Sequence, residues 1–138
     1  MKVLKYAPLA LLLVACVDTT TKIGDLKDIQ DQKVFFAYDS SEITSAAKDG
    51  LLAQSKYLKT HEGVKVQIAG NCDERGTVEY NLALGARRAN AAKQVLVKDG
   101  ISASRVKTIS YGKDRPAVTG AGESVWKQNR NAHTTVLK

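Results

Sequence analysis

The sequence has little cysteine and little histidine, with two of each in 138 residues. Cys16 and Cys72 alone cannot build the disulfide framework that stabilises many small secreted domains. No CxxC pair or histidine-rich spacing accompanies them, so we expect neither a metal nor another cofactor. The two cysteines lie in different parts of the chain, which predicts separate roles for them.

Motifs of catalytic chemistry are also missing, since the chain has neither a GxSxG nucleophile elbow nor an HExxH zinc motif. Asp39, Asp73 and Glu74 would in principle suit a pair of acids that cleaves a glycan. The two histidines, His61 and His133, lie apart from these residues in the predicted elements. We therefore predict that the chain is not an enzyme.

No apolar run is long enough to remain in a membrane. Residues 6–14 are apolar but reach only about half the length of a membrane-spanning helix. With the basic residues before them they have the plan of a secretory signal peptide, which we predict at residues 1–15. Leu13-Val14-Ala15-Cys16 resembles a bacterial lipobox, so Cys16 is the expected lipidation site, and its acyl chains would hold the protein at a membrane. Ordinary secretion with an incidental cysteine is the alternative.

Acidic residues are fewer than basic ones, 14 against 21, which favours partners of negative charge. The excess and the pair Arg87-Arg88 would also suit a nucleic acid. A secreted, lipid-anchored chain seldom meets one, and we predict no nucleic-acid partner. Trp126, Tyr80 and Tyr111 are accordingly interpreted as packing residues rather than as platforms on which bases stack.

The mature chain divides into a tether and one domain. Residues 16–33 hold the lipidated cysteine and a polar segment that we interpret as a flexible tether. Residues 34–138 have the apolar content of a single globular core.

Within this domain, strand and helix patterns alternate. We predict strands over residues 34–38, 64–68, 106–111 and 132–137, and helices over 43–59, 82–96 and around Trp126. The second helix has the clearest stripe of apolar and small residues, formed by Leu82, Gly85, Ala89, Ala92 and Leu96. The order predicts an α/β (α+β) two-layer sandwich with helices on one face of a small mixed sheet, but leaves the strand order open.

A polar loop with several glycines, residues 70–81, follows the second strand, and such loops often carry ligand sites. Asn81 and Arg88 are seven residues apart, so they project from one side of the following helix. Arg88 has apolar neighbours and needs an anionic partner, for which Asp73 is the nearest candidate. An Arg and an Asp side by side suit a zwitterion. A structural salt bridge that orders the loop is the alternative.

At this loop the chain resembles the OmpA-like peptidoglycan-binding family. The residues that carry the resemblance are 36–39, 73–77, 79–81, 84–90, 110–113, 115–117 and 129–130. The lipobox and short tether favour the lipoprotein members of that family over barrel-anchored or motor-associated ones.

The resemblance implies a ligand and a set of residues for it. The ligand is the stem peptide of peptidoglycan, held through the amino-acid group at the end of the diaminopimelate side chain. Asp73 corresponds to the aspartate that takes the ammonium, Arg88 to the arginine that takes the carboxylate and Asn81 to the polar residue beside them. Phe36, Tyr38 and Asp39 match the segment that lines the pocket.

Two positions depart from the family pattern, which commonly has histidine at residue 71 and arginine at residue 131, where this chain has Asn71 and Asn131. Cys72 is interpreted as a buried small hydrophobic residue. The resemblance also implies an outer-membrane location facing the periplasm and Tol-system partners, TolB and TolA, during cell division. An anchored protein that acts through Tol partners without binding the wall is the alternative.

Overall fold

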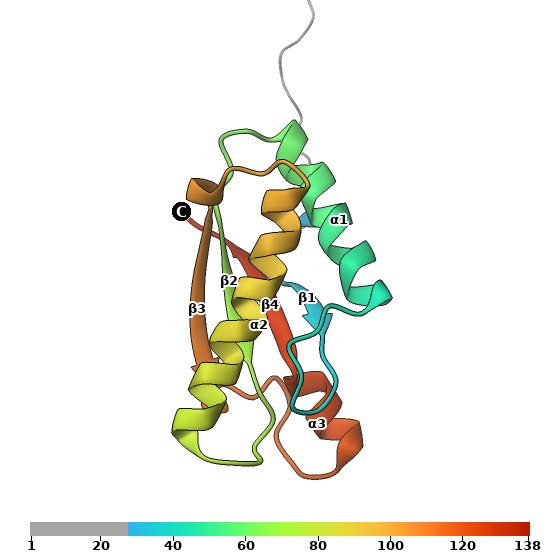
Figure 1. The fold of residues 1–138 in the computed structure, drawn as a ribbon, viewed down its shortest axis with the longest axis vertical. Helices are drawn as coiled ribbons and strands as arrows, with labels where there is room; N and C mark the ends of the chain where they lie inside the picture. Colours follow the sequence, from blue (N-terminus) through green and yellow to red (C-terminus); the bar gives the residue numbers. More distant parts are fainter. Residues whose placement is uncertain (1–27) are drawn as a thin grey trace, which may run out of the picture.

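The computed structural model describes residues 28–138, and the expected signal peptide, Cys16 and the tether as far as residue 27 lie outside the described residues. In chain order the elements are β1 (Gln32–Phe35), α1 (Ser45–Thr60), β2 (Val66–Asn71), α2 (Val78–Lys98), the 3-10 helix η2 (Ala103–Arg105), β3 (Val106–Gly112), α3 (Glu123–Asn129) and β4 (Asn131–Val136) (Figure 1).

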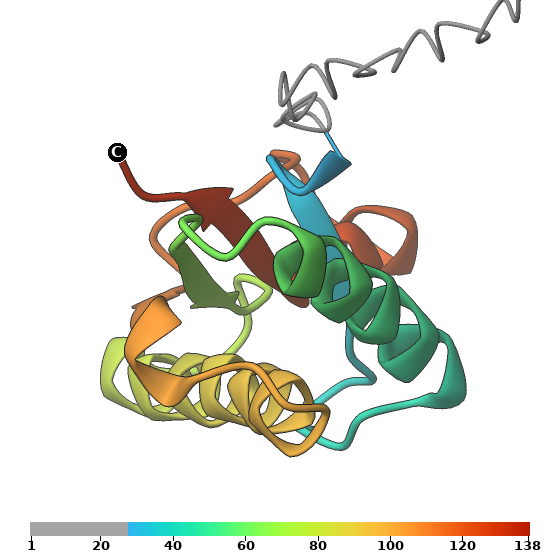
Figure 2. The ribbon, with the colours of Figure 1, turned by 90° about the horizontal axis from the view of Figure 1, so that it is seen from above.

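The four strands form one mixed sheet in the order β1-β4-β2-β3. β2 and β3 are parallel and joined through α2, whereas β4 runs antiparallel to both of its neighbours. Helices α1 and α2 lie beside each other against one face of the sheet (Figures 1 and 2). The predicted two-layer architecture is confirmed.

The core lies between this face and the two helices. Leu51 of α1, Ile68 of β2 and Leu96 of α2 are fully buried there. The predicted stripe on α2 is buried except at Leu82, whose side chain is 38% exposed. Leu82 presents its backbone carbonyl to β3 instead, where it accepts a hydrogen bond from Ser110 Oγ at 2.7 Å. Within residues 28–138, no helix has the length and apolar character needed to cross a membrane.

The domain starts earlier in the chain than the expected boundary at residue 34. Ile29 is fully buried in the core, and Gln30 Oε1 accepts a hydrogen bond from the backbone N–H of Val136. The sequence did not predict the burial of Ile29, because a single buried residue in a polar segment makes no periodic pattern.

The first strand ends at Phe35, earlier than predicted. Phe36 pairs with the Arg130 backbone, and the chain then turns, with Asp39 at a φ of 51°. Arg88 binds the carbonyl oxygens of Ala37 and Ser40 in this turn. These contacts place Tyr38 and Asp39 in a turn beside α2 rather than in the sheet.

Two glycines bring α2 onto the end of β2. A Cβ at Gly70 would lie 1.7 Å from the Gly85 carbonyl oxygen, and a Cβ at Gly85 would lie 2.3 Å from Ser110 Oγ. Only glycine at both positions permits this approach of helix and strand. It fixes the first turns of α2 against the carboxyl end of β2.

Candidate functional site

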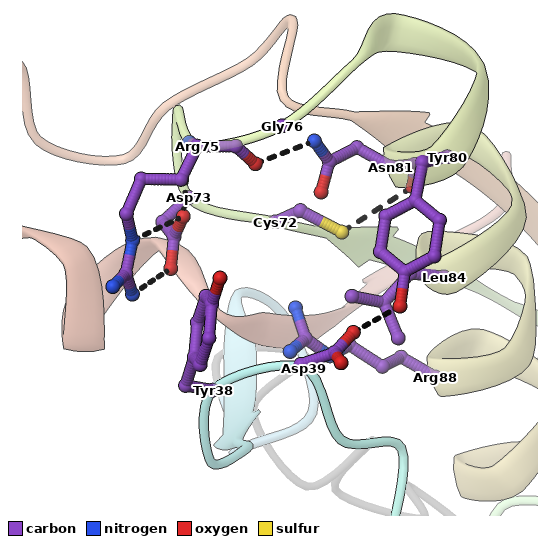
Figure 3. Close-up of a pocket in the computed structure, with 10 residues that line it drawn as sticks. All are labelled: Tyr38, Asp39, Cys72, Asp73, Arg75, Gly76, Tyr80, Asn81, Leu84 and Arg88. Atoms are coloured by element: carbon purple, nitrogen blue, oxygen red, sulfur yellow. Dashed lines mark hydrogen bonds and ion pairs between the residues drawn. The ribbon is translucent and has the colours of Figure 1, made fainter.

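A small pocket lies where β2 ends and α2 begins (Figure 3). Its lining residues are Tyr38, Asp39, Cys72, Asp73, Arg75, Gly76, Tyr80, Asn81, Leu84 and Arg88. The cavity measures about 60 Å³. A water molecule needs roughly 10–15 Å³ of such space, so the pocket has room for a group of about four to six heavy atoms, the size of an amino-acid head group.

Asp73 is an ionised carboxylate among the residues that line the pocket. It is 4% exposed and lies in the loop between β2 and α2. Burial alone would raise the pKa of Asp73, but hydrogen bonds from the side chain and backbone of Arg75, together with Arg130, lower it below the usual aspartate value. Arg75 Nε and Nη2 donate to its two oxygens at 3.1 and 2.8 Å, and Arg130 Nη1 lies 3.5 Å from Oδ2.

Among residues 28–138, Arg88 is the largest fully buried side chain, at 1% exposure. Its guanidinium donates to three backbone carbonyl oxygens: Nε to Ser40 at 2.8 Å, Nη1 to Asn71 at 2.9 Å and Nη2 to Ala37 at 3.1 Å. Burial lowers the pKa of Arg88, yet an arginine remains charged in proteins. These carbonyl oxygens use three of its five N–H groups, and the Cys72 thiol also lies beside the guanidinium. One N–H on each terminal nitrogen has no oxygen partner among residues 28–138.

The expected pairing of Asp73 with Arg88 is wrong. Asp73 pairs with Arg75 and Arg130, and Arg88 with carbonyl oxygens. Backbone carbonyls can satisfy a buried guanidinium without a carboxylate, because each presents a concentrated partial negative charge. Both side chains still line one pocket, so each can face the same ligand.

Asn81 holds the loop in place from the first turns of α2. It is 3% exposed, and its Nδ2 donates to the carbonyl oxygens of Arg75 and Thr77 at 2.8 and 2.9 Å. Among the hydrogen bonds of residues 28–138 its carboxamide oxygen has no donor, so that oxygen can accept one from a ligand. The predicted projection of Asn81 and Arg88 from one side of α2 is confirmed.

Cys72 is buried, as predicted, and its Sγ donates to the Asn81 carbonyl oxygen at 3.3 Å. Burial raises the pKa of its thiol, so the neutral form is favoured. Cys72 therefore joins β2 to α2 within the wall of the pocket.

Of the other predicted pocket residues, Tyr38 and Asp39 line the cavity, whereas Phe36 does not. Phe36 is buried behind it, with its ring 5.3 Å from the Arg88 guanidinium. Tyr80, for which the sequence predicts a packing role, is instead 46% exposed at the pocket, where its hydroxyl donates to Asp39. This bond closes one side of the pocket mouth (Figure 3).

Sequence reasoning missed Arg75. Its guanidinium lies between the rings of Tyr38 and Trp126, at 3.9 and 4.0 Å from their centroids, and pairs with Asp73. The one available signal was local: an Asp commonly accepts a hydrogen bond from the backbone two residues on, as Asp73 does from Arg75. The two rings come from distant parts of the chain and gave no signal.

The two departures from the family pattern lie outside the pocket and contact each other. Asn71 Nδ2 donates to Asn131 Oδ1 at 2.9 Å across the β2–β4 pair. Asn71 binds Arg88 through its backbone carbonyl oxygen, not through its side-chain amide. No three His, Cys, Asp or Glu side chains within the described part of the chain are placed to hold a metal ion.

Comparison with known proteins gives close relatives. The chain is 47% identical over 119 residues to the peptidoglycan-associated lipoprotein of Mesorhizobium japonicum, covering 86% of this chain and 67% of that protein. It is 47% identical over 100 residues to the protein of the same name from Legionella pneumophila, covering 72% of this chain and 57% of that one. The chain thus spans two thirds or less of the length of these relatives.

Solved structures have the same fold. The crystal structure of the peptidoglycan-associated lipoprotein from Burkholderia pseudomallei has a TM-score of 0.74 and 38% identity, covering 77% of this chain and 90% of that one. The periplasmic domain of Helicobacter pylori MotB has a TM-score of 0.65 at 18% identity, with 75% and 67% covered, and shows the fold alone.

The names of the matched lipoproteins denote association rather than reaction, and the prediction that the chain is not an enzyme is confirmed. The resemblance found in the sequence is confirmed as well. The OmpA family matches residues 35–130, well over half of the chain, and the chain therefore belongs to the OmpA family.

Proposed function

We propose that this protein binds peptidoglycan non-covalently and couples the outer membrane to the cell wall. Its ligand is the stem peptide, held by the amino-acid group at the end of the diaminopimelate side chain. One observation carries the proposal: a buried, ionised carboxylate, Asp73, and a buried guanidinium, Arg88, line one pocket of head-group size. Relatives at 47% identity that are named peptidoglycan-associated lipoproteins support it.

The chemistry of the pocket suits a zwitterion. The ligand ammonium binds Asp73, while its carboxylate accepts hydrogen bonds from the two remaining N–H groups of Arg88. The Asn81 carboxamide oxygen accepts a further bond from the ammonium. Arg130 can move away from Asp73 and remain paired with Glu123. Its Nη2 donates to Glu123 Oε1 at 2.6 Å and its Nη1 donates to Glu123 Oε2 at 3.2 Å.

The anchor is the second half of the proposed function. Acyl chains on Cys16 hold the outer membrane, the domain faces the periplasm and holds the wall, and the tether between them transmits force. Attachment through several chains on one terminus is lasting, because each buried methylene contributes about 0.8 kcal/mol. Tol-system proteins such as TolB and TolA are the proposed partners during cell division.

The test is calorimetric titration of the full chain in detergent with a stem peptide that contains diaminopimelate and with its lysine analogue. The lysine side chain has the ammonium but lacks the carboxylate. We expect the wild type to prefer the diaminopimelate peptide, and Asp73→Asn and Arg88→Ala to lose binding at least tenfold, which corresponds to about 1.4 kcal/mol.

Arg87→Ala is the matched control, since Arg87 is the neighbouring arginine on α2, is exposed and lies outside the pocket. It should bind as the wild type does. Melting curves test whether Arg88→Ala is folded. If Arg88→Ala does not fold, the nearly isosteric Asp73→Asn still tests the pocket. A folded wild type without preference for diaminopimelate would contradict the pocket assignment.

A further inference from the structure

The pocket has a second guanidinium, that of Arg75. In the binding mode proposed above, Arg75 contacts neither the ammonium nor the carboxylate of the ligand. Its side chain is 31% exposed, whereas Arg88 is almost completely buried. Arg75 Nε and Nη2 form a side-on pair with the two oxygens of Asp73. Of its five N–H groups, the three others have no partner among residues 28–138.

These free groups include the end-on fork formed by Nη1 and Nη2, the geometry with which arginine grips a carboxylate through two parallel hydrogen bonds. The guanidinium plane is held on both faces, by the rings of Tyr38 and Trp126. Trp126 is itself fixed, because its Nε1 donates to Glu74 Oε1 at 3.1 Å. The fork is therefore oriented before any ligand arrives, and little rotamer freedom remains to be lost on binding.

The charges beside Arg75 leave room for an anion. Asp73 takes the side-on edge of the guanidinium. Of the two other carboxylates nearby, Glu123 has both oxygens engaged by Arg130, and Glu74 accepts a hydrogen bond from Trp126 Nε1. Lys113 Nζ donates to the backbone of the same loop, to the carbonyl oxygens of Gly76 at 2.6 Å and Glu74 at 3.5 Å. Lys113 thus directs its donors to the loop backbone, whereas three N–H groups of Arg75 have no partner among residues 28–138.

We propose that Arg75 is a specificity-determining residue that binds a second carboxylate of the ligand, the main-chain carboxylate of a stem peptide that ends at diaminopimelate. The inference rests on the proposed function. Diaminopimelate carries an amino-acid group at each end, so when one end occupies the pocket of Asp73 and Arg88, the other end emerges at its mouth. A free carboxylate there receives the fork of Arg75, and an amidated or extended chain does not.

The test is a thermodynamic cycle between protein and ligand. The full chain in detergent is titrated calorimetrically with a tripeptide stem that ends in diaminopimelate, as the free acid and as the carboxyl-terminal amide. We expect amidation to weaken binding to the wild type about tenfold and to leave binding to Arg75→Gln unchanged. Arg87→Gln, which removes an exposed arginine outside the pocket, should respond to amidation as the wild type does.

The cycle separates this role from a structural one. If Arg75 only orders the loop, Arg75→Gln weakens both peptides by the same factor, and amidation keeps its full effect in the variant; that result overturns the inference. Equal binding of the two peptides by the wild type overturns it too, while leaving the proposed function standing. A wild type that binds neither peptide overturns the proposed function and this inference with it.

Discussion

At the scale of single residues, hydrogen bonds within the protein already hold the two charged side chains of the pocket, Arg88 and Asp73, in place. Arg88 joins the carbonyl oxygens of Ala37, Ser40 and Asn71, three points on two segments that are distant in sequence. An arginine suits this task because its planar fork has more donors than any other side chain. Asp73 keeps its charge because Arg75 and Arg130 stabilise the carboxylate. The pocket is thus largely preformed.

The lowered pKa of Asp73 predicts how stability depends on pH. A carboxyl group with a lower pKa in the folded than in the unfolded chain stabilises the fold above the unfolded value, and this contribution is lost as pH falls through the folded value. Asp99 and Glu123 also have lowered pKa values, through Ser55 and Lys59 and through Arg130 respectively. We expect the melting temperature to fall as pH drops below about 4.

Asp73→Asn measures how much of this pH dependence of stability comes from Asp73. Its melting temperature should lie below that of the wild type at pH 7, and the two curves should converge in acid, since a protonated aspartate resembles asparagine. Stem-peptide binding should weaken over the same pH range, because protonated Asp73 no longer attracts an ammonium. Scanning calorimetry at a series of pH values measures the difference. A gap as large at pH 2 as at pH 7 would show that the charge of Asp73 does not stabilise the fold.

At the scale of elements, the packing of α2 on β2 aligns the site. Thr77 begins the helix by accepting a hydrogen bond from the Tyr80 N–H at 3.1 Å, and this sets Asn81 and Arg88 on the pocket side. Gly70 and Gly85 then hold helix and strand at backbone contact. The carbonyl of Asn71 reaches Arg88 because the two elements lie this close.

Gly85→Ala tests this contact. The added Cβ would lie 2.3 Å from Ser110 Oγ and 2.8 Å from the Gly70 carbonyl oxygen, so helix and strand must separate. We expect a loss of about 1–3 kcal/mol in the free energy of unfolding, measured by urea denaturation, together with weaker stem-peptide binding. Gly50→Ala in α1 is the matched control. Its Cβ would meet only Val34 Cγ1, at 3.1 Å, and the higher helix propensity of alanine, worth about 1 kcal/mol, should keep it near the wild type. Equal stability of both variants would contradict the tight packing.

At the scale of the whole molecule, the start of the domain limits the reach of the proposed anchor. Ile29 is buried, so twelve residues separate it from Cys16. Fully extended, they span at most about 43 Å. The proposed coupling therefore works only where the wall lies close to the membrane.

Ile29→Ala measures where the domain begins. Removing the buried side chain should lower the free energy of unfolding by about 2–5 kcal/mol. Leu137→Ala, at a position that is 38% exposed in the last residues of the chain, should change it by less than about 1 kcal/mol. Urea denaturation of the full chain in detergent gives both values. If Ile29→Ala had the same free energy of unfolding as the wild type, residue 29 would belong to the tether and not to the domain.

The sequence by itself determined the order of the elements, the two-layer class and part of the pocket lining, namely Tyr38, Asp39, Asp73, Asn81 and Arg88. These depend on local patterns, such as the alternation of Val66 and Ile68 and the spacing of Asn81 and Arg88 along one helix. The tertiary structure alone decided the strand order, the burial of Ile29 and the partners of each charge. Arg88 meets carbonyls and Arg75 meets two rings because the sheet order and the glycine contact bring distant segments together. No local pattern records such contacts.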